Sequence, residues 1–412
     1  MSLKILHLHN YYGIKGGAEI VFRQTAKGIE KLCGNCKNYI VHSDTEGITQ
    51  ENHFKLNGRS EKKGFWKIVN YLYSIENRKK IGKIIKVIEP DIIHIHNVIT
   101  EISSSVVHII KKYKDLYGYK VIHTLHDFFL GCPNYYLYNF RKSEICQRCI
   151  GKNVKIPIFY TNCEERGYLY TLMKGINSII YNNIIKYRDA IDIFIVPSKT
   201  LKRGMIKDRM EKDKIKVIPN PVVIEDGDNS IDFNKKKGIV YFGRLSKEKN
   251  LSFLIETYIE MLKEGLTENL TIIGSGNELK EIEEKAGNFL NKEIEIIPFM
   301  ERNRLHKILR EKKIFVLPSR CVENFPISVI EAISLGIIPV VAYAGGGAEM
   351  IEYFEVGEIF EPYDKNSLKK AIKNTIKNYN RKIPSLKKAT KKCNDFSLDI
   401  YIKKIMDVYC QK

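Results

Sequence analysis

The sequence lacks a long hydrophobic run, because nowhere do its apolar residues approach the roughly 18 in succession that a membrane-spanning helix requires. It also lacks an export signal at its start, since the apolar stretch within residues 1–9 is too short and contains His7 and His9. These two absences predict a protein that stays in the cytoplasm and does not cross a membrane.

Cysteine is scarce, with nine residues in 412, an odd number. In a chain without an export signal, thiols are expected to stay reduced or to bind metal rather than to form disulfides. We accordingly expect Cys33 and Cys36 to lie in an ordinary loop. Four other cysteines have the spacing C-x13-C-x2-C-x13-C, which suits a tetrahedral structural zinc site, with reduced thiols as the alternative. They are Cys132, Cys146, Cys149 and Cys163.

Acidic residues are too few to balance the basic ones, and the formal net charge is +20, which favours an anionic partner. The sequence has no zinc-finger spacing of two cysteines and two histidines, no aromatic RNA-recognition signature and no clear helix-turn-helix, so we expect no nucleic-acid partner. Residues 62–86 carry eight basic residues against one acid, interleaved with aromatic and aliphatic side chains. This segment favours attachment to an anionic membrane surface. A helix that packs its apolar face on its own domain is the alternative.

Short apolar runs alternate with longer amphipathic stretches almost throughout the chain, which is the pattern of parallel β-strands covered by helices. We therefore expect a doubly wound α/β fold, and 412 residues are enough for two domains. The expected parts are a first domain at 1–221, a linker at 222–236, a second domain at 237–384 and terminal helices at 385–412. The expected strands are Lys4–His9, Tyr39–His42, Asp91–His96, Tyr119–Thr124, Ile193–Pro197, Gly238–Phe242, Asn269–Ile273, Glu293–Ile297, Ile314–Pro318, Ile338–Ala342 and Val356–Phe360.

Four short motifs lie near the ends of expected strands. They are Gly16-Gly17-Ala18-Glu19, the stretch Tyr241–Asn250, the stretch Glu323–Glu331 and Gly345-Gly346-Gly347-Ala348-Glu349. The third motif places one glutamate in a loop and a second on the helix that follows Pro326. In this order and spacing the set resembles the family 4 glycosyltransferases. The resemblance implies a GT-B fold, in which two Rossmann-like domains face a cleft and the last helix crosses back to the first domain.

Two of the motifs suggest how a phosphorylated ligand is bound. Arg244 and Lys249 follow an expected strand and precede a helix, and fixed cations there would stabilise the negative charge that develops on a departing diphosphate. Gly16 and Gly17 precede a helix, where backbone N–H groups without obstructing side chains can approach a phosphate. A plain strand-to-helix turn is the alternative for the glycines, and the G-x-G-x-x-G pattern of dinucleotide folds is absent.

The resemblance also implies individual roles in binding a nucleotide-sugar donor. It assigns the diphosphate to Arg244 and Lys249, the ribose hydroxyls to Glu331, the base to the backbone around Phe299 and Met300, and the donor sugar to the loop of Glu323, Asn324 and Phe325. The family is commonly Gly-rich in that loop, so this chain departs from it where the sugar is contacted. His126 matches an active-site histidine of the family. We interpret His123 as structural and His94 and His96 as strand-end or core histidines.

The predicted activity is therefore that of a retaining, hexosyl-type glycosyltransferase acting on a hydroxyl of a growing glycan. The expected acceptor is a lipid-linked intermediate of a cell-surface polysaccharide. The enzyme is expected to bind it at the inner face of the cytoplasmic membrane. No cofactor is expected for the chemistry, because the only D-x-D motif, Asp226-Gly227-Asp228, lies in the expected linker. The alternatives are a glycoside hydrolase that uses Glu323 and Glu331 as its two carboxyl groups, and a basic nucleic-acid-binding protein.

Overall fold

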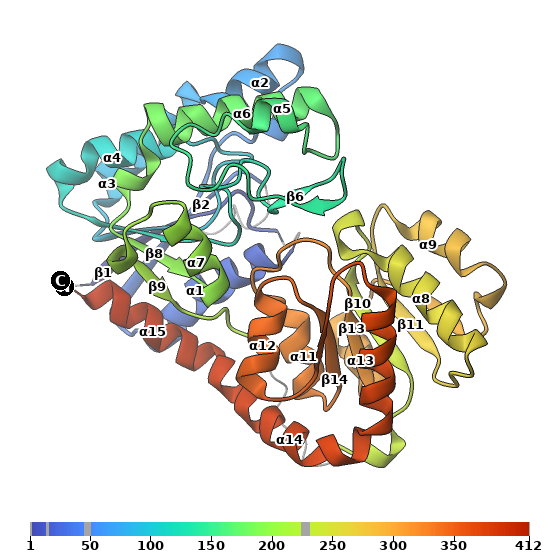
Figure 1. Ribbon diagram of the computed structural model, residues 1–412. Coiled ribbons are helices and arrows are strands. Elements are labelled where there is room, and N and C mark those ends of the chain that lie inside the picture. Colours follow the sequence, from blue (N-terminus) through green and yellow to red (C-terminus); the bar gives the residue numbers. More distant parts are fainter. Residues whose placement is uncertain (1, 14–15, 45–50, 224–230, 412) are drawn as a thin grey trace. The chain divides into compact units, whose positions relative to one another are not determined.

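The protein is described here by a computed structural model, which covers residues 2–13, 16–44, 51–223 and 231–411 (Figure 1). The chain folds into two compact units. Unit 1 comprises Met1–Tyr136, Gln147–Pro221 and Leu398–Lys412, and unit 2 comprises Leu137–Cys146 and Val222–Ser397. Within the predicted linker, residues 224–230 lie outside the described residues, and so do Asp226 and Asp228 of the D-x-D motif.

A seven-stranded parallel sheet forms the centre of unit 1. In spatial order its strands are β3 (His53–Lys55), β2 (Cys36–His42), β1 (Leu3–Leu8), β4 (Ile92–Ile95), β5 (Lys120–Thr124), β8 (Ile193–Val196) and β9 (Ile215–Val217). The order runs outward from β1 in one direction and from β4 in the other, which is the doubly wound order of a Rossmann fold. Sheets of this kind bind ligands beyond the carboxyl ends of their strands at the point of reversal, here between β1 and β4.

Unit 2 repeats this topology in a six-stranded parallel sheet. In spatial order its strands are β12 (Ile294–Pro298), β11 (Leu270–Ser275), β10 (Ile239–Arg244), β13 (Ile314–Leu317), β14 (Ile338–Ala342) and β15 (Glu358–Phe360). The strand order reverses between β10 and β13. A small antiparallel hairpin of β6 (Tyr138–Asn139) and β7 (Glu144–Ile145) also belongs to unit 2.

Helices connect most of the strands in both units (Figure 1). Those of unit 1 are α1 (Gly17–Leu32), α2 (Gly64–Leu72), α3 (Ile75–Ile88), α4 (Ser105–Tyr117), α5 (Ile158–Thr161), α6 (Tyr168–Ile179), α7 (Lys199–Lys207) and α15 (Leu398–Cys410). Those of unit 2 are α8 (Leu251–Lys263), α9 (Leu279–Ala286), α10 (Arg302–Leu309), α11 (Ile327–Ser334), α12 (Gly346–Phe354), α13 (Lys365–Lys377) and α14 (Tyr379–Lys392). Within the described part of the chain, no helix combines the length and hydrophobicity needed to span a bilayer.

The prediction of a doubly wound α/β fold is confirmed, and every predicted strand overlaps an observed one. These strands were recognisable because a parallel sheet covered on both faces is built from continuous apolar runs. In β13 and β14 every residue is buried. The sequence did not predict β3 and β9, which are three-residue edge strands with polar or exposed positions, nor the two-residue strands of the β6–β7 hairpin.

The last helix, α15, packs in unit 1 against α1. Its Tyr401, Ile402 and Ile405 are buried in a cluster with residues of α1 and the central strands. Gly28 of α1 permits this close approach, since a Cβ atom there would lie 2.6 Å from Cγ1 of Ile402. A hydrogen bond of 2.6 Å between Tyr409 Oη and His94 Nδ1 also ties the helix to β4.

Cys33 and Cys36 form a disulfide, so the expectation that both stay reduced in a loop is wrong. Cys33 follows the last residue of α1 and Cys36 is the first residue of β2. The tight helix-to-strand turn holds their Cα atoms 5.4 Å apart, within the range that a disulfide can bridge.

Candidate functional site

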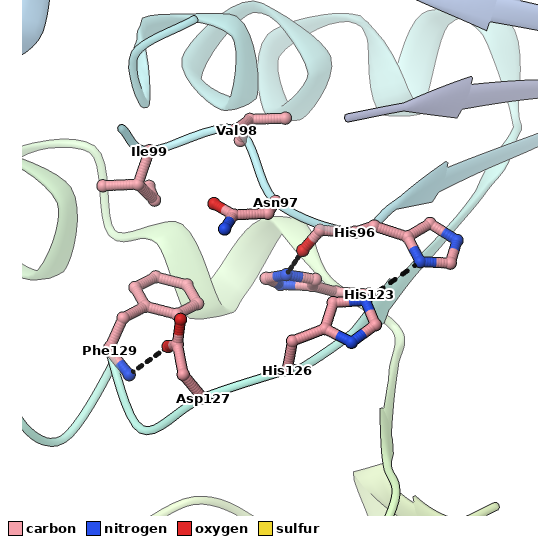
Figure 2. Close-up of a pocket in the computed structure, with 8 residues that line it drawn as sticks. All are labelled: His96, Asn97, Val98, Ile99, His123, His126, Asp127 and Phe129. Atoms are coloured by element: carbon pink, nitrogen blue, oxygen red, sulfur yellow. Dashed lines mark hydrogen bonds between the residues drawn. The ribbon is translucent and has the colours of Figure 1, made fainter. Parts of the chain in front are cut away.

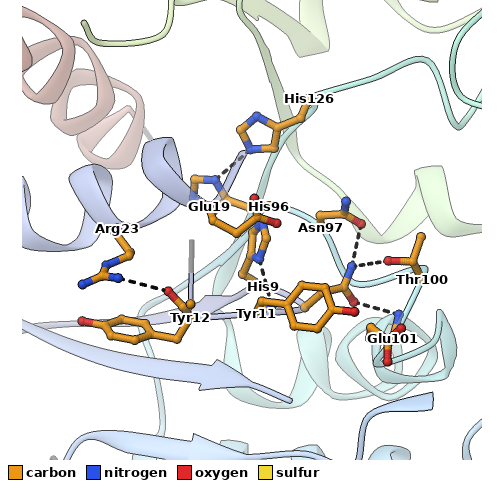
Figure 3. Close-up of polar contacts among 12 residues, drawn as sticks. His9, Tyr11, Tyr12, Glu19, Arg23, His96, Asn97, Thr100, Glu101 and His126 are labelled. Atoms are coloured by element: carbon orange, nitrogen blue, oxygen red, sulfur yellow. Dashed lines mark hydrogen bonds and ion pairs between the residues drawn. The ribbon is translucent and has the colours of Figure 1, made fainter. Parts of the chain in front are cut away.

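At the reversal point of unit 1, the same sequence pattern ends two neighbouring strands. His7-Leu8-His9-Asn10 closes β1 and His94-Ile95-His96-Asn97 closes β4. The parallel register pairs His7 with His94, so the two asparagines that follow lie side by side. The amide of Asn10 donates to Asn97 Oδ1 at 3.0 Å and to Thr100 Oγ1 at 2.8 Å (Figure 3). We did not predict this role for Asn10, although the repeated pattern is visible in the sequence.

Asn10 also fixes the loop that follows β4. Its Oδ1 accepts hydrogen bonds from the backbone N–H groups of Glu101 at 3.1 Å and Ile102 at 3.2 Å. All four polar contacts of this one buried side chain hold the carboxyl ends of β1 and β4 together. These contacts connect β1, β4 and the loop after β4 at the point of reversal.

The glycine-containing turn lies between β1 and α1, and its residues 14 and 15 lie outside the described part of the chain. Asp44 Oδ2 anchors the start of the turn by accepting the N–H groups of Tyr12 at 3.0 Å and Gly13 at 2.8 Å. Gly16 is the N-cap of α1, and apart from the chain neighbours of Gly17 and the backbone of α1, no heavy atom of the described residues lies within 4 Å of the place where a Cβ of Gly17 would sit. The start of α1 thus has an open backbone beside the ends of β1 and β4.

His9 and Glu19 lie next to this turn (Figure 3). His9 Nδ1 accepts the backbone N–H of Tyr11 at 3.1 Å, which leaves the proton of the neutral ring on Nε2. That Nε2 atom lies 3.9 Å from Oε1 of the buried Glu19. Burial lowers the pKa of His9 to about 3, so this pair is a neutral imidazole beside a carboxylate.

A pocket lies at the ends of β4 and β5 (Figure 2). It is lined by His96, Asn97, Val98, Ile99, His123, His126, Asp127 and Phe129. The ring of His126 stacks on that of His96, with the centroids 5.4 Å apart and Nε2 of His126 at 3.2 Å from Nδ1 of His96. His123 Nε2 donates to the backbone oxygen of His96 at 2.8 Å, which keeps this ring in the sheet.

The charges of the pocket are set by burial. It lowers the pKa of His126 to about 4, so the imidazole is neutral near pH 7. It raises the pKa of Asp127 to about 6, even though that carboxylate accepts the N–H of Phe129 at 2.8 Å. A neutral His126 can donate or accept a hydrogen bond to a hydroxyl group but supplies no permanent positive charge.

In unit 2, three predicted residues come together at the ends of β10 and β13. Lys249 Nζ donates to Glu323 Oε1 at 2.5 Å, and both side chains are largely buried. Arg244 belongs to the end of β10, is 62% exposed and lies 3.6 Å from the buried Glu248. The backbone N–H of Arg320 donates to Glu248 O at 2.8 Å, which joins the two loops.

The Lys249–Glu323 pair stays ionised in its buried place. Burial raises the pKa of Glu323, but the ammonium of Lys249 outweighs it and holds that pKa below its usual value. Conversely, burial lowers the pKa of Lys249 and the carboxylate of Glu323 raises it overall. Ser319 Oγ also donates to Oε1 of Glu323. The result is a fixed cation and a fixed acceptor at the point of reversal.

The glycines of the fourth motif make room for the Glu323 loop. The Gly346 N–H donates to Glu323 O at 2.6 Å, and Glu323 pairs with Gly345 in an isolated β-bridge. A Cβ on Gly345 would meet Glu323 O at 2.4 Å, and one on Gly346 would meet Asn324 O at 2.2 Å. The loop at Glu323 and Asn324 thus packs directly against Gly345 and Gly346. A side chain at either glycine would collide with the backbone of that loop.

Asn324 and Phe325, predicted near the donor sugar, continue this loop. Phe325 is partly buried against the core of unit 2, with its ring centroid 6.0 Å from that of Phe396. Asn324 is half-buried. Phe325 thus packs on the core of unit 2 at a position where the family is commonly Gly-rich.

Glu331 lies on α11 and forms an ion pair with Arg302, the first residue of α10. Arg302 was not predicted, although it follows the strand β12 by only a short loop that contains Phe299 and Met300. Phe299 is 76% exposed, whereas Met300 packs against the core of unit 2. Phe299 is thus an exposed aromatic ring on the loop between β12 and α10, which ends just before Arg302.

Of the four cysteines predicted to bind zinc, Cys132, Cys149 and Cys163 are buried in unit 1, and Cys146 is half-buried at the edge of the β6–β7 hairpin. The described residues also contain a buried group of three histidines, His7, His94 and His96, whose ligand atoms lie within 4.8 Å of one another.

Two family models match the chain. One described as Glycosyltransferase Family 4 matches residues 15–226, and one described as Glycosyl transferases group 1 matches residues 224–393. The glycogen synthase of Thermodesulfovibrio yellowstonii is 26% identical over 174 residues, which cover 42% of this chain and 34% of that protein. The Escherichia coli UDP-Gal:alpha-D-GlcNAc-diphosphoundecaprenol alpha-1,3-galactosyltransferase is 25% identical over 209 residues, which cover 48% of this chain and 54% of that protein. The matches span about a third to a half of the length of these relatives.

Solved structures resemble the whole chain. That of Anabaena HepE in complex with UDP and glucose covers 98% of this chain and 99% of its own, with a TM-score of 0.67 and 15% sequence identity. A glycosyltransferase from Rickettsia africae covers 99% and 98%, with a TM-score of 0.69 and 18% identity. At such identities the likeness concerns the fold alone.

Proposed function

The chain belongs to glycosyltransferase family 4, and we propose that it transfers a hexosyl group from a nucleoside-diphosphate sugar to a hydroxyl of a growing glycan with retention of configuration. Its fold is GT-B, an α/β fold of two Rossmann-like units. The observation that carries the donor part of the proposal is the pair of cations, Arg244 and Lys249, at the reversal point of unit 2.

These cations suit a diphosphate leaving group. Charge develops on the diphosphate as the sugar bond breaks, so groups fixed in advance stabilise the transition state more than the ground state. Lys249 is fixed by Glu323, whereas the guanidinium of Arg244 is exposed and can grip two oxygens. Glu331 is an ionised acceptor suited to two ribose hydroxyls, and the exposed Phe299 suits a base. The UDP in the HepE structure supports a donor of this class.

The unit 1 pocket supplies the acceptor side of the proposal. A neutral His126 beside Asp127 offers hydrogen bonds to hydroxyl groups without a charge that would repel a cationic transition state. Retention and the hexosyl specificity are implied by the family rather than by this geometry.

Nucleotide sugars should stabilise the folded chain. At a hundred times its dissociation constant, a ligand adds roughly 2.7 kcal/mol to the free energy of unfolding. We therefore expect one of the UDP-, GDP- or ADP-sugars to raise Tm by several degrees and the matching free sugar to have no effect. The Arg244→Ala variant is the control, because it should fold but lose most of the shift. If no nucleotide sugar stabilises the protein or is turned over, the proposal fails.

Transfer should continue in the presence of EDTA. Lys249 and Arg244 already provide positive charge at the site proposed for the diphosphate, so an added divalent ion is not needed there. The measurement is initial rate on dialysed enzyme with and without EDTA. Complete inactivation that Mg²⁺ or Mn²⁺ reverses would contradict this expectation. A slow loss of stability that only Zn²⁺ reverses would instead concern the cysteines.

A glycoside hydrolase is less compatible with these carboxylates. Such an enzyme needs one carboxyl group kept protonated as a general acid, which requires a raised pKa. The pKa of Glu323 is lowered, because Lys249 outweighs the effect of burial, and Glu331 is ion-paired with Arg302. Hydrolysis of glycans without any nucleotide sugar would reinstate this alternative.

We further propose that the enzyme attaches reversibly to an anionic membrane, where a lipid-linked acceptor would be met. The name of the E. coli relative gives a sugar on diphosphoundecaprenol as its substrate, which supports an acceptor of this class. In unit 1, α2 exposes Phe65 and Trp66 to 70% and 68% and buries Asn70 and Tyr71 on its other side. Lys63 and Lys67, also exposed, flank the two aromatic rings. Such a face suits the headgroup region of a bilayer.

Helix α6 contacts α2 (Figure 1). Its first two residues, Tyr168 and Leu169, are also exposed. By contrast, Lys62 and Lys80 of the predicted basic segment are ion-paired with Glu76, at 3.2 Å and 3.5 Å. We therefore centre the proposed attachment on α2 within the segment 62–86.

Sedimentation with vesicles measures the attachment. We expect wild type to bind phosphatidylglycerol vesicles at low salt and phosphatidylcholine vesicles weakly, because each basic residue near an anionic surface adds about 1 kcal/mol. The Lys63→Gln/Lys67→Gln variant should bind about thirtyfold more weakly by the same estimate, and Phe65→Ser/Trp66→Ser should also lose binding. The matched control is Lys263→Gln/Lys370→Gln, which removes the same charge from exposed positions of unit 2. Equal binding by all variants would exclude α2 as the contact.

A further inference from the structure

Four histidine rings follow one another in unit 1, from the sheet to the pocket. The ring centroid of His94 lies 5.7 Å from that of His7 and 4.3 Å from that of His96. The centroid of His126 follows at 5.4 Å from that of His96. The first three residues are at most 2% exposed, whereas His126 lines the pocket (Figure 2). The proposed transfer uses only His126 of this histidine column and gives the three buried members no role.

The two inner rings of the column are held by groups that do not line the pocket. His94 Nδ1 is hydrogen-bonded to Tyr409 Oη at 2.6 Å, and its Nε2 is hydrogen-bonded to Thr124 Oγ1 at 2.8 Å. His7 Nε2 lies 3.2 Å from Asn38 Oδ1, an acceptor, and therefore carries the proton of that ring. The orientation of both inner rings is thus fixed independently of any ligand in the pocket.

The proton of His96 can be assigned from its surroundings. Burial lowers the pKa of His96 well below its usual value, so the ring is neutral and carries one proton. Its Nδ1 lies 3.2 Å from His126 Nε2, whereas its buried Nε2 has no hydrogen-bond partner among the described residues. A proton on Nε2 would make a buried N–H without an acceptor, which is rarer in folded proteins than an acceptor without a donor. The proton therefore lies on Nδ1, which donates to His126.

This hydrogen bond determines the tautomer of His126. Its Nε2 accepts the bond from His96. The His126 ring is also neutral near pH 7, because burial lowers its pKa to about 4. Which nitrogen of a neutral histidine carries the proton is decided by the bond that the other nitrogen makes. The single proton of His126 is therefore on Nδ1, and from that atom the ring can only donate.

We propose that His96 is a positioning residue, which holds His126 in the neutral Nδ1–H tautomer so that His126 donates a hydrogen bond to a hydroxyl oxygen of a sugar in the pocket. The sugar rests on the proposed function, but the tautomer does not. A neutral imidazole can polarise an oxygen atom as an imidazolium does. Unlike an imidazolium, it places no cation beside the positive charge that develops on a sugar ring in the transition state. The inner rings act by holding His96.

A metal ion is the competing explanation for His7, His94 and His96, whose ligand atoms lie within 4.8 Å of one another. Both nitrogens of His94, however, are already hydrogen-bonded, to Tyr409 and to Thr124. An ion would have to break one of these buried bonds. Three neutral imidazoles would also leave the charge of the ion uncompensated in the core, which is costly. The assigned tautomers require neither change.

Nitrogen NMR of the whole chain labelled with ¹⁵N-histidine tests the assignment without any substrate. At pH 7 we expect His126 to be protonated at Nδ1 and unprotonated at Nε2, with its signals identified by their loss in His126→Asn. His96 should likewise be protonated at Nδ1. A proton on His126 Nε2, or an imidazolium ring, would overturn the proposal. Metal that purifies with the wild-type protein and is lost in His7→Asn would favour the competing site and also overturn it.

Substitution of His96 tests the positioning itself. Asparagine can place its Nδ2 donor where the histidine has Nδ1, because both atoms are bonded to Cγ. We therefore expect His96→Asn to keep the tautomer of His126 and a kcat close to that of wild type. His96→Ala removes the donor, so it should mix the two tautomers of His126 and lower kcat by about tenfold, on the scale of one hydrogen bond.

His108→Ala is the matched control, since His108 lies on α4, binds Tyr73 at 2.8 Å and does not line the pocket. It should change neither the tautomer nor kcat. An unchanged tautomer and rate in His96→Ala would overturn the proposal. The expected tautomer in a protein that transfers no sugar would support the assigned proton and contradict the proposed function, so the two failures are distinguishable.

Discussion

Arg244→Ala is expected to lower kcat/KM for the nucleotide-sugar donor by about 10² or more, on the scale of losing one electrostatic stabiliser of a transition state. Its guanidinium is 62% exposed and its contact with Glu248 is 3.6 Å long. Because the guanidinium is exposed to solvent, this long ion pair with the buried Glu248 contributes only about 0–1 kcal/mol to folding. Activity should therefore fall while Tm stays close to that of wild type.

Lys249→Ala is expected to lose activity to at least the same extent but also to lose stability. Unlike Arg244, Lys249 is largely buried against Glu323. Removing one partner of a buried ion pair costs about 3–5 kcal/mol, because the other charge is left uncompensated. Lys247→Ala is the matched control, since it removes an exposed charge from the same loop. Near-normal turnover in both Arg244→Ala and Lys249→Ala would remove these cations from the active site.

Glu323→Gln should lower kcat by about 10² with little change in donor KM, if its contacts to the sugar strengthen in the transition state. The substitution keeps the shape but removes the charge that fixes Lys249. Glu331→Ala should instead raise donor KM more than it lowers kcat, because ribose contacts are made equally in ground and transition states. Steady-state kinetics with the donor found by thermal shift separates the two effects.

Arg302 provides the control for Glu331. Arg302→Gln leaves the Glu331 carboxylate in place but removes its ion pair, so it should raise donor KM less than Glu331→Ala does. Equal and small effects of the changes at Glu323 and Glu331 would show that the pair is only part of the protein surface.

The Lys249–Glu323 pair also predicts a pH dependence of stability. The pKa of Glu323 is lower in the folded than in the unfolded chain, so the pair stabilises the fold above the unfolded value of about 4.5. This contribution is lost as the pH falls through the folded pKa. Glu323→Gln should lack that part of the acid sensitivity, which denaturant titrations between pH 3 and pH 7 would reveal.

The sequence predicted those features of the fold that depend on local chemistry. Buried parallel strands such as β13 and β14 are continuous apolar runs, which the sequence shows directly. The order of the strands was not predictable in detail, because it is decided by packing between residues far apart in the chain. Short edge strands such as β3 were missed because three residues carry too little periodicity.

Site residues were predicted where the side chain itself indicates its chemistry, as a lysine or a glutamate does. Residues were missed where their role depends on a contact with a partner far away in the sequence. Lys249 and Glu323 were both identified, but their contact spans seventy-four positions and only the fold brings them together. Arg302 was missed because an arginine at the start of a helix is ordinary until Glu331 is seen opposite it. Asn10 was missed because its importance depends on the register of β1 and β4.

The place of α15 has a consequence for how the protein is made. Unit 1 begins at the amino terminus but is completed by Leu398–Cys410, which the ribosome synthesises after all of unit 2. Until then the apolar residues of α1 and the central strands that α15 covers, among them Val21 and Ile29, remain open to solvent or to chaperones. The first unit to emerge is thus the last to be finished, because its folding is completed only after Leu398–Cys410 has been synthesised.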